Sequence, residues 1–122
     1  MKSLAVHHVA LNVTDLDEAL SFYTGRLGFE LRDDRPDLGF PGAWLDAGAE
    51  QLHLIEAEVP PARGQHFAVR VEDIEAAIAD LRAAGVEVTD AVPIGTACQA
   101  FLHDPSGNQI ELHQVGARAA AG

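Results

Sequence analysis

The fold is decided by a stretch that occurs twice, His8-Val9-Ala10-Leu11-Asn12-Val13 and, 58 residues later, His66-Phe67-Ala68-Val69-Arg70-Val71. The same offset superimposes Gln51-Leu52-His53-Leu54 on Gln109-Ile110-Glu111-Leu112. Similarity at a fixed period indicates a supersecondary unit that is repeated along the chain. The repeat therefore predicts that four side chains from equivalent positions meet at one place: His8, His66, His53 and Glu111.

Length and composition favour one acidic domain with a real core. A chain of 122 residues that is 48% hydrophobic can bury such a core, whereas either half alone would be marginal. We therefore expect the halves to share a buried surface, with a small-molecule site at the seam. The net charge of −11 repels nucleic acid and anionic membrane surfaces, so neither is expected as a partner.

The chain also lacks the signals of export or membrane insertion. No stretch approaches the roughly 18–20 apolar residues that span a bilayer, and the first residues lack the apolar run of a secretion signal. Cys98 is the only cysteine, which excludes an intrachain disulfide. We expect a cytoplasmic protein.

Periodicity and breaking residues predict the same order of elements, β-α-β-β-β, in both halves. Thr14-Asp15 caps the first helix and Gly28 stops it, while Pro60-Pro61 lies in the join. The predicted boundaries are module one at 4–57 (strands 5–13, 29–32, 43–47 and 51–56), the linker at 58–64, module two at 65–115 (strands 66–71, 86–89, 97–103 and 109–114, helix 73–84) and a frayed tail at 116–122.

Three motifs resemble the vicinal oxygen chelate superfamily, which includes glyoxalase I, extradiol dioxygenases and bleomycin-binding proteins. They are His8 to Val13, Phe22-Tyr23 followed by Leu27-Gly28-Phe29, and Asp104 to Leu112. The resemblance covers residues 4–115. It implies an α+β fold in which two tandem βαβββ modules form an open, barrel-like cup of mixed sheet, and one divalent metal ion held at His8, His53, His66 and Glu111.

Strand alternation supports this ligand set independently. Because alternate residues of a strand share a face, the histidines and Glu111 lie opposite apolar neighbours such as Leu52 and Ile110. The apolar side must meet the helices, which leaves the polar side for the cup. Imidazoles with one carboxylate suit Zn²⁺, Ni²⁺, Fe²⁺, Co²⁺ or Mn²⁺ and leave positions open for a substrate. The alternative is that these histidines and Glu111 bind no metal and are ordinary hydrogen-bonded strand residues.

Further polar and aromatic residues are expected beside this cup. Arg70 could bind a carboxylate or phosphate of the substrate or form a structural ion pair, and Asn12 is its repeat partner. Trp44 and Phe101 occupy equivalent strands and either pack in the core or line the pocket. His113 could reach the cup rim. His7, by alternation, should face away from His8.

A metal in an open cup can polarise a carbonyl and stabilise an enolate while Glu111 moves a proton. We therefore expect lyase or isomerase chemistry of the glyoxalase I type, although His53 replaces one of the two carboxylates usual in that group. A non-haem iron dioxygenase that uses His8, His66 and Glu111, and a metal-free binding protein like the bleomycin resistance proteins, are the alternatives. Unpaired sheet edges predict a homodimer, with modules paired within or between chains.

Overall fold

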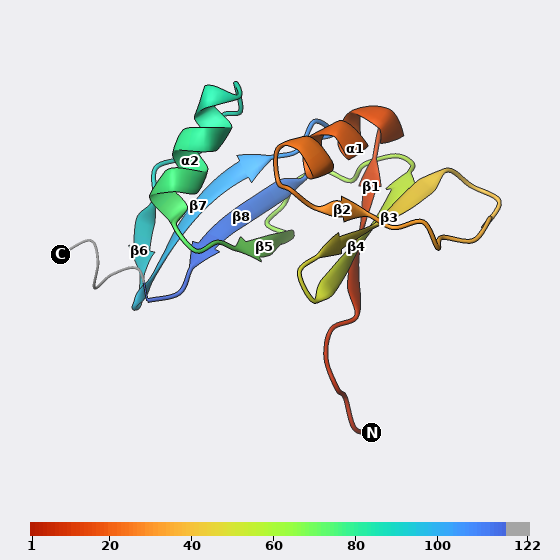
Figure 1. Ribbon diagram of the computed structural model, residues 1–122, viewed down its shortest axis with the longest axis horizontal. Coiled ribbons are helices and arrows are strands. Elements are labelled where there is room, and N and C mark those ends of the chain that lie inside the picture. The colour runs from red at the N-terminus through yellow and green to blue at the C-terminus, as the bar shows by residue number, and fades with distance from the viewer. Residues whose placement is uncertain (117–122) are drawn as a thin grey trace. The chain divides into compact units, whose positions relative to one another are not determined.

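The computed structural model describes residues 1–116 and divides into two compact units, Met1–Pro61 and Ala62–Gly122. Within residues 1–116, each unit contains one helix and one four-stranded mixed sheet, with the helix packed on one face of its own sheet (Figure 1). The predicted α+β class and the repeated βαβββ order are confirmed. The prediction of a frayed tail concerns residues 116–122, which apart from Gly116 lie outside the described part of the chain.

The first unit places its first and last strands side by side. The strands are ordered β1-β4-β3-β2, with β1 parallel to β4 and the other pairs antiparallel. The register joins Ala10 to His53 and His53 to Trp44. The element bounds are β1 His8–Val13, α1 Leu16–Gly25, β2 Glu30–Leu31, β3 Gly42–Ala47 and β4 Glu50–Glu56.

The second unit repeats this topology as β5-β8-β7-β6, again with its first and last strands parallel. Here Ala68 is paired with Glu111, and Glu111 with Phe101. The register of β5 on β8 is therefore the register of β1 on β4 moved along by the repeat. The element bounds are β5 His66–Arg70, α2 Ile74–Ala83, β6 Val92–Ile94, β7 Ala97–His103 and β8 Gln109–Gln114.

Matching caps begin both helices. Asp15 Oδ1 accepts a hydrogen bond from the Glu18 amide at 3.0 Å, and Asp73 Oδ1 accepts one from the Ala76 amide at 3.1 Å. Each bond satisfies an amide that has no partner inside the helix. The cap predicted for the first helix at Thr14-Asp15 is confirmed at Asp15. No helix in residues 1–116 has the length and apolar character needed to cross a bilayer.

The helix-facing side of each sheet carries the core. Leu52 and Leu54 of β4, like Ile110 and Leu112 of β8, are almost fully buried, and each such side chain contributes about 1.5–3 kcal/mol on burial. Tyr23 of α1 is completely buried. Because strand side chains alternate, this packing leaves Gln51, His53, Glu111 and His113 on the face away from the helix.

Two predicted strand positions were wrong. The stretch 86–89 forms no strand, and β6 lies further along at Val92–Ile94. Val88 is instead buried, and its carbonyl accepts a hydrogen bond from Arg82, while Thr89 is hydrogen-bonded to Phe101 through both its amide and its hydroxyl. β1 begins at His8 and not at Ala5, because β4 offers no partner beyond Glu50.

Candidate metal-binding and substrate-binding faces

Three aromatic rings from three neighbouring strands stack on the polar face of the first unit. The rings of His8 and His53 are parallel to within 13° with centroids 3.9 Å apart, and Trp44 stacks on the other side of His53 at 4.5 Å. The strand register brings them together, since His53 lies beside Trp44 and diagonally from His8. Two predicted ligands are therefore in contact, and Trp44 is half-buried against them outside the core.

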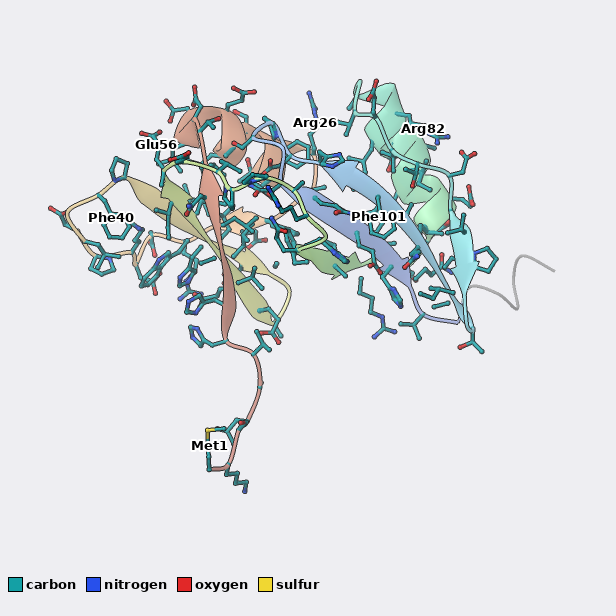
Figure 2. The ribbon with its side chains drawn as sticks, turned by 180° about the vertical axis from the view of Figure 1, so that it is seen from behind. Met1, Arg26, Phe40, Glu56, Arg82 and Phe101 are labelled. Atoms are coloured by element: carbon teal, nitrogen blue, oxygen red, sulfur yellow. The ribbon has the colours of Figure 1, made fainter. Side chains whose placement is uncertain are left out.

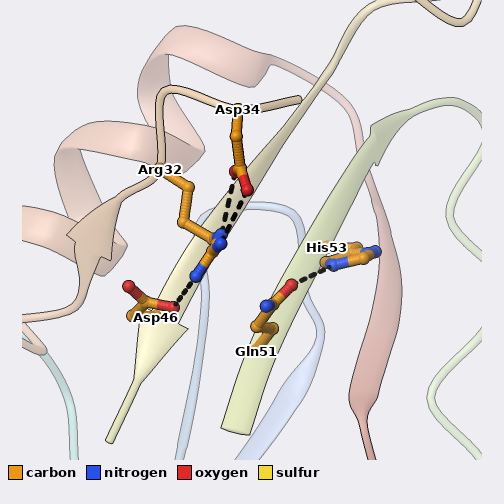
Figure 3. Close-up of polar contacts among 5 residues, drawn as sticks. All are labelled: Arg32, Asp34, Asp46, Gln51 and His53. Atoms are coloured by element: carbon orange, nitrogen blue, oxygen red, sulfur yellow. Dashed lines mark hydrogen bonds and ion pairs between the residues drawn. The ribbon is translucent and has the colours of Figure 1, made fainter. Parts of the chain in front are cut away.

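Gln51 fixes the ring of His53 from two residues earlier on the same strand. Gln51 Oε1 lies 2.8 Å from His53 Nε2 (Figure 3). Because an amide oxygen only accepts, the Nε2–H group donates, and Nδ1 keeps the lone pair of a neutral ring. Partial burial lowers the pKa of His53, and positive charge from His8 and His7 lowers it further. A neutral imidazole is the form that binds a metal.

His7 lies beside the ring of His8, which corrects the prediction that it faces away. Its Nδ1 is 2.9 Å from His8 Nδ1, and the two rings meet edge to face at 5.1 Å. The prediction relied on strand alternation, but His7 precedes β1 and is not bound by it. His8 thus has a ring neighbour on each side.

Sequence analysis missed an ion-pair cluster centred on Arg32. Its guanidinium binds both oxygens of Asp34, at 2.9 and 2.7 Å, and Asp46 Oδ1 at 2.8 Å (Figure 3). These bonds raise the pKa of Arg32, and its guanidinium lowers the pKa of Asp34. Asp46 is opposite Gln51 in the sheet, so the cluster borders the ring stack. The short spacing of Arg32-Asp33-Asp34 along the chain was the only feature of the sequence that could have predicted this cluster.

The second unit brings His66, Glu111 and His113 together on the equivalent face. His66 Nε2 lies 3.1 Å from Glu111 Oε1, and His113 Nδ1 lies 2.9 Å from Glu111 Oε2. Phe101, which projects from β7 (Figure 2), meets the His66 ring edge to face at 5.6 Å. Phe101 is half-buried, so it, like its counterpart Trp44, flanks a predicted ligand and does not belong to the core.

The backbone fixes the orientation of the His66 ring. Its Nδ1–H donates to the carbonyl of Gly64 at 2.8 Å, which leaves Nε2 directed at Glu111. That carbonyl, followed by the Glu111 carboxylate, raises the pKa of His66. In the neutral ring, Nε2 and Oε1 direct lone pairs toward one another. A cation, either a proton or a metal ion, must therefore lie between them.

The donor set fits a divalent ion in its chemistry, and the two units fit it differently in geometry. Two ligands at 2.0–2.2 Å from one ion stand about 3 Å apart, which is the separation of His66 Nε2 and Glu111 Oε1. His8 and His53 are stacked in nearly parallel planes, and their in-plane lone pairs cannot meet until one ring turns. Within either unit, no group of three or more His, Cys, Asp or Glu side chains among residues 1–116 is placed so that all of them could hold one metal ion.

Arg70 and Asn12 occupy equivalent positions on the two faces but have different surroundings. Asn12 Nδ2 donates to the carbonyl of Glu58 at 2.8 Å, which ties β1 to the linker. Within residues 1–116 the arginines in ion pairs are Arg32 and Arg82, so the charge of Arg70 stays available. An open depression of about 460 Å³ lies at the ends of β5 and β8, and it is lined by Arg70, Val71, Glu72, Gln114 and Val115.

Comparison with known proteins establishes the family. The Glyoxalase/Bleomycin resistance protein/Dioxygenase superfamily model matches residues 5–112. A "Probable lactoylglutathione lyase" of Vibrio parahaemolyticus is 33% identical, over 100% of this chain and 98% of that protein. The chain belongs to this superfamily, as its motifs predicted.

Solved structures agree with this assignment. A glyoxalase family protein of Bacillus anthracis has a TM-score of 0.86 at 25% identity, covering 94% of this chain and 98% of that chain. TnmS3, an antibiotic binding protein from a Streptomyces species, has a TM-score of 0.82 at 28% identity with the same coverage. The fold is therefore shared by proteins described in different functional terms.

Proposed function

We propose that this chain is a metal-dependent lyase or isomerase of the glyoxalase I type that acts on a small oxygenated molecule. The observation that carries the proposal is the His66 and Glu111 pair, whose Nε2 and Oε1 atoms stand 3.1 Å apart, which is the separation of two ligands on one ion. The similarity to lactoylglutathione lyases supports the reaction class.

The ion would be held by four residues, and the same residues define the chemistry. Bound there, a divalent ion supplies a Lewis acid that polarises a substrate carbonyl. Glu111 is the base that takes a proton from the carbon next to that carbonyl, since it is the one carboxylate in the set. The proposed ligands are His8, His53, His66 and Glu111.

The remaining polar and aromatic residues of these faces would bind the substrate. Trp44 and Phe101 flank the histidines and offer apolar walls that exclude water. Arg70, which has no ion pair among residues 1–116, offers a positive charge at a depression large enough for part of a small molecule. We infer that the substrate carries a carboxylate or another anionic group, with Asn12 and His113 as further polar contacts.

Elemental analysis followed by a lyase assay tests the proposal. The purified protein should carry one of Zn, Ni, Fe, Co or Mn near one equivalent per site. Activity on lactoylglutathione should disappear with a chelator and return when the metal is added back. A protein that retains none of these metals and is inactive with each of them would overturn the proposal.

A binding protein without metal is the second candidate, because the antibiotic binding protein TnmS3 shares the fold closely. Metal content separates it from the enzyme. A dioxygenase is the third, because His8, His66 and Glu111 provide two histidines and one carboxylate, and the superfamily includes dioxygenases. Consumption of dioxygen during turnover, with iron as the active metal, would identify it.

We also propose a cytoplasmic homodimer. β1 and β5 are edge strands of their sheets, and unpaired edges favour pairing with another chain. Light scattering at micromolar concentration should give twice the chain mass, and a monomeric mass would contradict the assembly.

A further inference from the structure

Glu111 is contacted on both of its carboxylate oxygens. Oε1 faces His66 Nε2 at 3.1 Å, while Oε2 accepts a hydrogen bond from His113 Nδ1–H at 2.9 Å. His113 follows Glu111 by two residues on β8, so strand alternation places both side chains on the same face. The orientation of the carboxylate is thus set from outside by His113.

Partial burial of both side chains strengthens the hydrogen bond between His113 and Glu111. The side chain of Glu111 is only 12% exposed and that of His113 is 32% exposed. A hydrogen bond to a carboxylate is stronger than one between neutral groups, and restricted access of water strengthens it further. Without His113, rotation about the last side-chain bond of Glu111 would leave either oxygen, or neither, directed at His66.

The repeat shows that the fold does not require this contact. The position equivalent to His113 in the first unit is Ile55, which cannot donate a hydrogen bond. His53, the counterpart of Glu111, is held instead by Gln51 from the other direction along its strand. Each proposed ligand on a last strand is therefore held by a polar residue two positions away on that strand. This residue is Gln51 for His53 and His113 for Glu111.

We propose that His113 is a positioning residue that holds Glu111 Oε2 so that Oε1 is presented to the metal ion. The inference rests on the proposed function, because it assigns a role toward the same ion. Groups that orient metal ligands in this way typically change metal affinity 10- to 100-fold when they are removed.

Three variants test the role of the donor. His113→Leu removes it, and His113→Gln retains an N–H group that can reach the carboxylate. His103→Leu is the control, because His103 is an exposed histidine at the end of the neighbouring strand β7. The dissociation constant for Zn²⁺ is measured by chelator competition, with kcat and KM on lactoylglutathione and with the unfolding free energy of the metal-free protein.

We expect Zn²⁺ to bind His113→Leu about 10- to 100-fold more weakly, His113→Gln to recover most of that loss, and His103→Leu to match the parent. The metal-free unfolding free energies should be similar. Parent affinity in His113→Leu, or equal losses in the Leu and Gln variants, would overturn the positioning role while the proposed function stands. Failure of the parent itself to bind Zn²⁺ or any other candidate metal would overturn both.

Discussion

The polar faces of the two units share one register and differ in chemistry. In the first unit, His8, His53 and Trp44 form a stack of rings. In the second, the position of His53 is taken by Glu111, a carboxylate held between two histidines. Duplication thus fixes where the side chains stand, while the residue type at each position decides whether it can act as a base.

The two proposed ligand pairs also differ in geometry: His66 and Glu111 form a preorganised pair, whereas His8 and His53 must rearrange before both can bind one ion. His66 and Glu111 already stand at the spacing of two ligands on one ion. His8 and His53 face each other through their π surfaces, so one ring must turn before both can bind. We therefore expect the second unit to dominate metal retention.

The largest effect on metal retention should come from removing a member of the preorganised pair, His66 and Glu111. His66→Ala or Glu111→Ala should abolish metal retention through dialysis, whereas His8→Ala or His53→Ala should weaken it and leave a measurable fraction bound. Elemental analysis after dialysis gives the metal content of each variant. Stoichiometric metal in a His66→Ala, Glu111→Ala double variant would refute the site.

A suitable control for that series is His103→Ala, which removes an exposed histidine of the second unit. His7→Ala is not neutral, because the His7 ring contacts the ring of His8. Equal metal loss in all four ligand variants would contradict the difference between the two units.

The two hairpins before the last strands give the next comparison. Two residues join β3 to β4, whereas β7 and β8 are joined by a longer turn. In that turn, buried Asp104 accepts hydrogen bonds from the amides of Ser106 and Asn108 and from Asn108 Nδ2. Asp104→Ala should lower the free energy of unfolding by about 3 kcal/mol, because buried donors lose a charged acceptor.

Urea unfolding monitored by circular dichroism measures this loss. Asp104→Asn keeps an acceptor oxygen for the two amides and should lose about half as much. A decrease in the free energy of unfolding of less than about 0.5 kcal/mol in Asp104→Ala is typical of a surface substitution. Such a result would contradict a stabilising role for these hydrogen bonds.

The smallest predicted effect compares two arginines. Arg32 is held by Asp34 and Asp46, while Arg70 forms no ion pair within residues 1–116. If Arg70 binds an anionic substrate group, Arg70→Ala should raise KM about 10- to 100-fold with little change in stability, since a hydrogen bond to a charged group contributes about 1.5–3 kcal/mol. Arg32→Ala should leave KM unchanged and lower stability slightly.

Steady-state kinetics and thermal melting on both variants separate these roles. An unchanged KM in Arg70→Ala together with a lowered melting temperature would assign Arg70 a structural role.

The sequence determined the elements and their faces because these follow from local rules. Period-two alternation placed His53 and Glu111 opposite the buried leucines and isoleucine of their strands, and Asp15 and Asp73 marked the helix starts. The repeat predicted which strands carry the four proposed ligands, and the structure then pairs the first strand of each unit with the last, so that both proposed ligand pairs are in contact within their units.

Tertiary structure decided the contacts that no local rule predicts. Val88 is buried where a strand was expected, and the ladder with β7 starts only at Val92, because burial and hydrogen bonding to Arg82 override strand propensity there. Trp44 stacks on the polar face, although a large aromatic side chain favours a place in the core, because the neighbouring strand places His53 beside it.

The convergence of the four ligands on one ion stays a prediction from the sequence repeat. The sequence by itself determined which residues repeat and which face they share, because both depend only on spacing along one strand. Only the tertiary structure showed that Arg32 binds two carboxylates, that His7 contacts His8 and that His113 holds Glu111. Those contacts depend on side-chain rotamers and on neighbours brought together by strand register, which spacing along the chain does not encode.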